Sequence, residues 1–156
     1  RCVENHQGAA GNIILILANL PDFLRKPMLQ SRMKEFFAMT EAERREMIDL
    51  ALAAAPAMNP AKLAVLVKTW LEVISEFDPE KRMILFRAYS EQISTKPESI
   101  EGFDIPSLTQ TFVSLDAKHQ EKIIDSLHEV LFSIPNRAEI LKLIPEDMQR
   151  ALKLKS

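Results

Sequence analysis

The segment Thr40–Ala55, TEAERREMIDLALAAA, decides the fold class, because it combines a helix start with a helical apolar pattern. Thr40 can cap the helix, and Glu43 three residues later supplies the partner of a capping box. Downstream, one helical face collects the apolar side chains Met47, Ile48, Ala51, Leu52 and Ala55. Pro56 ends the pattern, since proline does not continue a helix. The segment therefore predicts an amphipathic helix that buries one face.

The same kind of helix start recurs along the chain. A capping side chain followed by a good helix beginning occurs at Asn59-Pro60, at Asp78-Pro79 and at Asp116. A short helix is expected over residues 107–114. A last helix is expected to begin at Ile144-Pro145 and to end near Leu154. We expect seven or eight helices in all.

The helix starts are evenly spaced, and several apolar positions share the spacing. Met39, Phe77 and Leu115, each directly before a capping residue, follow one another at 38-residue steps. Four further apolar columns have the same step: Phe36, Ile74 and Phe112; Met47, Leu85 and Ile123; Ile48, Phe86 and Ile124; Ala51, Tyr89 and Leu127. This pattern predicts about three repeated helix pairs. The alternative is a coincidence among amphipathic helices of similar length.

These tandem helix pairs resemble HEAT-like helical repeats, while the signatures of tetratricopeptide and ankyrin units are missing. The expected fold is all-α, with tandem helix pairs in a ~38-residue repeat, as a short HEAT-like solenoid or a compact helical bundle. Residues 1–156 are expected to form a single domain, with 1–11 as a frayed lead-in and 94–106 as a longer loop. Because position 1 is Arg, we expect a fragment or a processed chain.

Composition is that of a globular protein, with 47% hydrophobic and 27% charged residues. The formal net charge of -2 gives no strong field toward nucleic acid or anionic membrane. Cys2 is the only cysteine, which excludes an internal disulfide and suits the cytoplasm. The apolar run Ile13–Ala18 is far shorter than the ~20 residues of a spanning helix. We predict that it is a buried helix.

No catalytic, cofactor or metal site is predicted. Glu121, Asp125 and His128 share one face of an expected helix, but no second helix supplies a matching Glu-x-x-His pair. A solvated polar face is the favoured interpretation. Cys2 and His6 lack the rigid frame that nucleophilic catalysis needs. The glycine pair of the lead-in has no preceding strand, as a phosphate loop would require.

The leading functional prediction is a protein–protein interaction or regulatory scaffold, without catalytic activity. Stacked helix pairs present an extended face formed by one helix of each unit. The candidates for this face are Arg44, Glu46, Arg82, Arg87, Glu91, Gln120, Asp125 and His128. The expected partner is a protein or a second copy of the chain. Nucleic acid is not expected, because acidic neighbours dilute the basic residues at the helix starts. Arg44 and Arg82 share the 38-residue step, but the third member of this column is the uncharged Gln120.

The alternative prediction is a helical bundle that binds a small apolar ligand in its core. The methionines fall mainly in the first half of the chain, and together with the run Ile13–Ala18 they would supply the walls. An enclosed pocket with one or two converging polar groups would favour this alternative. A tightly filled core would exclude it.

Overall fold

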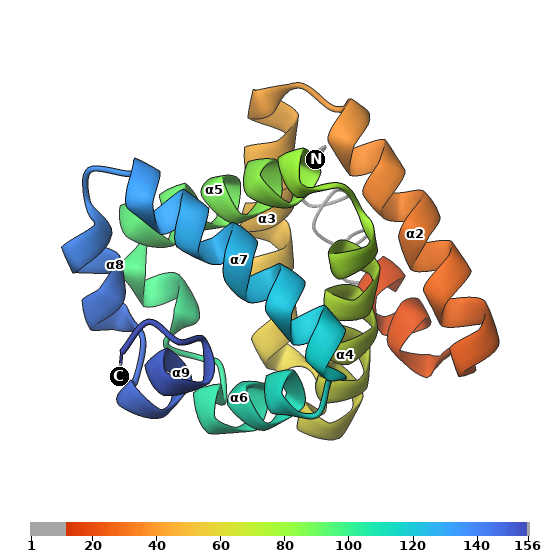
Figure 1. Ribbon diagram of the computed structural model, residues 1–156. Coiled ribbons are helices and arrows are strands. Elements are labelled where there is room, and N and C mark those ends of the chain that lie inside the picture. Colours follow the sequence, from red (N-terminus) through yellow and green to blue (C-terminus); the bar gives the residue numbers. More distant parts are fainter. Residues whose placement is uncertain (1–11, 156) are drawn as a thin grey trace.

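The computed structural model describes residues 12–155, and across this range the chain is helical and contains no strand (Figure 1). The expected all-α fold is therefore confirmed. The predicted frayed lead-in, residues 1–11, lies outside the described residues, as do Cys2 and His6.

Nine α-helical segments follow one another in the described range, against seven or eight expected. The first covers residues 12–19. The others are α2 (Asp22–Ala38), α3 (Glu41–Ala54), α4 (Pro60–Glu76), α5 (Pro79–Thr95), α6 (Ile105–Val113), α7 (Ala117–Ser133), α8 (Arg137–Leu143) and α9 (Glu146–Ala151), with short 3₁₀ turns η1 (Ala55–Ala57) and η2 (Pro97–Ile100).

The helix starts lie where the capping residues predict them. Thr40 and Glu43 form the expected capping box: the Thr40 hydroxyl accepts from the Glu43 N–H at 3.2 Å, and the Glu43 carboxylate accepts from the Thr40 N–H at 2.9 Å. Asn59, Asp78 and Asp116 each accept hydrogen bonds from the first turn of α4, α5 and α7. These bonds satisfy amide groups that a helix start leaves unpaired.

Three boundaries differ from the sequence expectation. Residues 94–106 are not one loop, because α5 extends to Thr95, η2 follows, and α6 begins at Ile105. The last helix ends at Ala151, three residues before the predicted end at Leu154. There Lys153 adopts a positive φ of 56°, and the Leu154 N–H reaches back to the Gln149 carbonyl at 2.7 Å. A left-handed residue followed by an N–H that bonds to the carbonyl five residues earlier is a Schellman motif, a common helix C-terminus.

A recurring side-chain bond fixes the corners between helices. Arg25, Arg44, Arg82, Gln120 and Gln149 each donate to the backbone carbonyl five residues earlier. Each of these side chains lies in the first turns of a helix, and each accepting carbonyl belongs to the residue before the cap. The bonds satisfy carbonyl groups that the chain reversal would otherwise leave unpaired.

Alternate helices pack together more closely than consecutive ones. α2 packs on α4 and α4 on α6, while α3 packs on α5 and α5 on α7. α7 also packs on α4, and Figure 1 shows it crossing in front of the molecule. The most deeply buried apolar side chains are Ile48, Val73, Ile74, Leu85 and Val130. The core therefore lies where α3, α4, α5 and α7 meet.

The apolar run Ile13–Ala18 is helical but only partly buried. Leu17 and Ala18 are buried, whereas Leu15 and Ile16 are about half exposed. The prediction of a buried helix therefore holds for the face with Leu17 and Ala18 and is wrong for the face with Leu15 and Ile16. The segment of residues 12–19 lies at the margin of the nine helices, so only one of its faces contacts the core.

Candidate ligand-binding cavity

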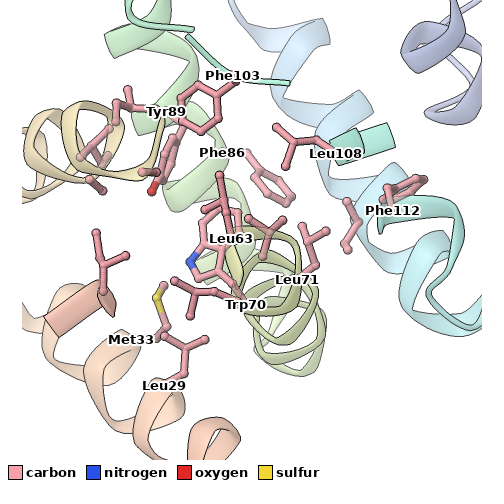
Figure 2. A pocket seen from close by; sticks show the side chains of 18 of the residues that line it. Leu29, Met33, Leu63, Trp70, Leu71, Phe86, Tyr89, Phe103, Leu108 and Phe112 are labelled. Carbon is pink, nitrogen blue, oxygen red and sulfur yellow. The ribbon is translucent and has the colours of Figure 1, made fainter. Parts of the chain in front are cut away.

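The helices α2, α4 and α6 form one row, and α3, α5 and α7 form a second. The space between the two rows holds a cavity of about 440 Å³. Figure 2 shows side chains from α2, α4, α5 and α6 pointing into it. Further walls come from residues 12–19, α3, α7 and α9. Protein interiors usually contain few voids larger than a water molecule. A cavity of this size in a 156-residue chain is therefore a specific feature of the fold rather than imperfect packing.

The walls are almost entirely apolar. The lining side chains that carry no polar group are Ile13, Ile14, Leu17, Leu29, Met33, Phe36, Met47, Ile48, Ala51, Leu52, Ala55, Leu63, Leu66, Val67, Leu71, Phe86, Phe103, Leu108, Phe112, Ile123, Leu127, Met148, Ala151 and Leu152. The remaining described lining residues are Arg32, Trp70, Tyr89 and Thr109. An apolar wall with a few placed polar groups is the usual make-up of a small-molecule site.

Two of the four polar lining residues are already paired within the protein. The Thr109 hydroxyl donates to the Ile105 carbonyl at 2.9 Å, as helical threonines commonly do. The Arg32 guanidinium lies 3.2 Å from the Glu35 carboxylate, and both side chains are about half exposed. Arg32 therefore lies at the solvent-facing rim, and its charge is neutralised there.

Trp70 and Tyr89 are the two polar side chains of the interior wall. Their rings pack edge to face, with centroids 5.5 Å apart and an interplanar angle of 65°. No described residue accepts a hydrogen bond from the Trp70 indole N–H or from the Tyr89 hydroxyl. Burial raises the pKa of Tyr89 to about 12, so the hydroxyl keeps its proton at physiological pH. Both groups are thus donors available to whatever occupies the cavity.

Small residues at key positions keep the cavity open. Ala51, Ala55 and Ala151 line it, and a larger side chain at any of them would project into the space. Gly102 has a related role outside the wall: a Cβ there would lie 3.1 Å from the Pro56 Cβ. The close approach brings the adjoining Phe103 ring onto the cavity wall (Figure 2).

The eight residues predicted for an interaction face do not share one environment. Arg82 is buried, and Arg44 and Gln120 are half-buried and hydrogen-bonded to the helix corners. Arg87 donates to Ser133 at 3.1 Å, and His128 Nε2 lies 3.0 Å from the Leu152 carbonyl. The candidates with exposed side chains are Glu46, Glu91 and Asp125. Arg82 in particular makes its hydrogen bonds inside the protein instead of presenting its charge on a surface.

Neither a metal centre nor a membrane span is found among residues 12–155. No three His, Cys, Asp or Glu side chains of this range gather where they could hold a metal ion. No helix of the same range combines the length and apolar character needed to cross a bilayer.

Comparison of the chain with models of protein families, with curated proteins and with solved structures found no match.

Proposed function

We propose that this protein binds a small apolar molecule in the central cavity. The observation that carries the proposal is a volume of about 440 Å³ bordered by apolar side chains from both rows of helices and open to solvent at a rim that includes Arg32. This volume lies within the range of ~300–1,000 Å³ that is typical of ligand pockets. An apolar cavity of only ~150 Å³ already binds benzene, so this one accommodates a considerably larger molecule.

The physical reason is the hydrophobic effect. An apolar molecule that enters the cavity leaves water and gains dispersion contacts with the apolar walls. The lining side chains gain as well, because the ligand supplies atoms for them to contact. Binding therefore stabilises the ligand complex and the fold together.

The chain supplies its own reporter for the test, because Trp70 is the only tryptophan and lines the cavity. The probe is 1-N-phenylnaphthylamine, an uncharged apolar dye whose absorption overlaps tryptophan emission. We expect saturable quenching of Trp70 by energy transfer to the dye, with a one-to-one stoichiometry. A quench that rises linearly with dye and never saturates would contradict the proposal.

A matched pair of variants assigns the binding to the cavity. Ala51 lines the cavity, whereas Ala53 lies two residues along the same helix and is exposed. Ala51→Phe fills part of the space and is expected to weaken dye binding at least tenfold, while Ala53→Phe leaves it unchanged. Ala55→Leu, also on the wall, provides a second filling variant if Ala51→Phe lowers the melting temperature. Equal binding by all of these folded variants would place the dye elsewhere.

A second candidate function, a helical-repeat interaction scaffold, is favoured by the exposed apolar residues of the N-terminal part. Of the nine large apolar side chains exposed in the described range, five are Leu15, Ile16, Phe23, Leu24 and Met28. Packing between alternate helices and the recurring corner bonds support the repeat on which this candidate rests.

The scaffold candidate has its own test. Phe23 is 75% exposed, so Phe23→Ser removes apolar surface without disturbing the core. If this surface mediates self-association, the concentration-dependent mass from light scattering falls to that of a monomer in the variant. A wild-type chain that is monomeric at high concentration would argue against self-association. The cavity and the surface are separate, so the dye titration is unaffected by this result.

A further inference from the structure

The interior wall distinguishes one class of apolar ligand from another. A cavity for plain hydrocarbon needs only alkyl and aromatic walls. The lining residues Trp70 and Tyr89, however, carry hydrogen-bond donors, and no described residue accepts a hydrogen bond from either of them. Both side chains are half-buried and line the cavity, so their donors face a molecule within it. A ligand that accepts from them gains hydrogen bonds that a plain hydrocarbon cannot form.

Resting on the proposed function, we infer that the ligand is an uncharged molecule with a hydrogen-bond-accepting oxygen, which receives the Tyr89 hydroxyl or the Trp70 indole N–H while its hydrocarbon part fills the cavity. Ketones, aldehydes and esters of long-chain or ring-bearing hydrocarbons belong to this class. The acceptor end lies at the Trp70–Tyr89 ring pair.

The arrangement of the ring pair supports one shared acceptor position. The rings contact edge to face at 5.5 Å between centroids, so the two donors belong to neighbouring side chains of the cavity wall. In the view of Figure 2 the indole nitrogen and the phenol oxygen point to the same side of the pair, toward Met33. The thioether of Met33 is a weak acceptor and leaves both donors available for an oxygen.

The charge distribution argues for a neutral ligand over a carboxylate. Arg32 is the only charged residue among the described lining residues, and Glu35 already pairs with it at the solvent rim. A carboxylate at the ring pair would be buried without a counter-charge, which costs far more than two neutral hydrogen bonds return. The raised pKa of Tyr89 shows the same preference of this environment for neutral groups.

Because Trp70 and Tyr89 both offer donors, they select a ligand that carries an acceptor atom. The indole N–H can only donate, and a tyrosine hydroxyl that keeps its proton donates to any stronger acceptor nearby. A hydroxyl or amine of the ligand would bring a donor of its own into a wall that is almost entirely apolar, whereas a carbonyl only accepts. A carbonyl oxygen can therefore accept a hydrogen bond from either group.

Three ligands of equal carbon number test the inference: n-dodecane, 2-dodecanone and laurate. Each is measured by displacement of 1-N-phenylnaphthylamine, followed by the emission of the dye itself, from the wild-type chain, from Tyr89→Phe and from Trp70→Phe, at a pH where laurate is ionised. Phe103→Leu alters the wall without touching a donor and serves as the matched control. Melting curves confirm that each variant is folded.

We expect Tyr89→Phe to weaken 2-dodecanone binding about fivefold and to leave n-dodecane binding unchanged. Trp70→Phe has the same selective effect, Phe103→Leu changes both ligands alike, and laurate is the weakest competitor. The inference is overturned if Tyr89→Phe and Trp70→Phe both leave the ratio of ketone to alkane affinity at the wild-type value, or if laurate binds best. In either case the dye still binds, so the proposed function stands. Failure of the dye itself to bind would instead remove the proposed function.

Discussion

At the scale of single residues, the buried arginine of α5 shows how the chain satisfies its own helix ends. Arg82 donates from Nε to the Ser126 hydroxyl at 2.8 Å and from Nη1 to the carbonyl of Ser75 at 3.2 Å. It also donates to Phe77, the residue before the cap of its own helix. One side chain thus ties the end of α4, the start of α5 and the middle of α7 together.

Arg82→Ala is expected to lower the free energy of unfolding by about 2–4 kcal/mol, since it leaves buried acceptors without a donor. Arg82→Gln should restore part of this loss, because Gln120 makes the same corner bond in α7. Urea unfolding at neutral pH measures both. Arg45→Ala, on an exposed ion pair with Glu41, is the control and should cost less than ~0.5 kcal/mol. Equal losses for Arg82→Ala and Arg45→Ala would refute the corner role.

Tyr89 gives a second prediction at this scale, because it is the only tyrosine of the chain. Burial raises its pKa from an ordinary 10.0 to about 12 in the folded protein. The unfolded state therefore loses this proton first as pH rises. The stability that Tyr89 contributes is complete below pH 10, falls as pH rises above 10, and is lost by about pH 12.

The measurement is an ultraviolet titration of phenolate absorbance, paired with thermal melting between pH 9 and pH 11. We expect the folded protein to titrate well above pH 10, and Tyr89→Phe to flatten the alkaline decline in melting temperature. A midpoint at the ordinary value of 10.0 would show that the hydroxyl is solvated rather than held in an apolar wall.

At the scale of helices, Glu76 links three of them. Its carboxylate lies 2.6 Å from Lys26 Nζ on α2 and 3.7 Å from His119 Nε2 on α7, while Glu76 itself ends α4. Burial alone would raise the pKa of Glu76, but the hydrogen bonds and positive charges of Lys26 and His119 lower it below the ordinary 4.5. The carboxylate is more than a third exposed, so its effect on stability is modest.

Glu76→Gln should therefore reduce stability at neutral pH by less than ~1 kcal/mol. Because the folded pKa is depressed, the contribution is present above pH 4.5 and is lost as pH falls through the folded pKa. The wild-type and variant unfolding curves should converge as the pH falls below the folded pKa of Glu76. Glu91→Gln, on an exposed part of α5, is the control. A difference that persists unchanged below the folded pKa of Glu76 would assign the effect to packing instead of charge.

Most helices could be predicted from the sequence because their signals are local. A capping side chain such as Thr40, Asp78 or Asp116 acts within one turn, and a proline resets the pattern within one residue. The end of α9 was missed because the left-handed conformation of Lys153 depends on bonds to the preceding turn, and lysine carries no sign of it. The helix α8 lacks a side-chain cap and so gave no signal.

At the scale of the whole molecule, the cavity could not be predicted from the sequence, although many of its lining residues fall on predicted apolar faces. A residue such as Phe86, Tyr89 or Leu127 has the same pattern whether it fills a core or borders a space. The difference depends on how far apart two rows of helices lie. That distance is set by packing between alternate helices, which are not neighbours in the chain.

Ligand binding should raise the melting temperature of the whole domain, because the cavity is bordered by most of its helices. At a free dye concentration of about 100 times the dissociation constant, linkage predicts about 2.7 kcal/mol of stabilisation. For a chain of this size that corresponds to a rise of roughly 5–10 °C. Scanning calorimetry with 1-N-phenylnaphthylamine measures the shift. Ala51→Phe should show a much smaller shift, and an equal shift in both proteins would contradict binding in the cavity.

The most direct test of the central claim is a crystal structure of the protein soaked with 1-bromododecane, read by the anomalous scattering of bromine. The account predicts a bromine peak and continuous alkyl density within the space bordered by Trp70, Tyr89 and Leu127. A well-ordered structure in which the side chains close the space, with bromine absent or only at the surface, would contradict it.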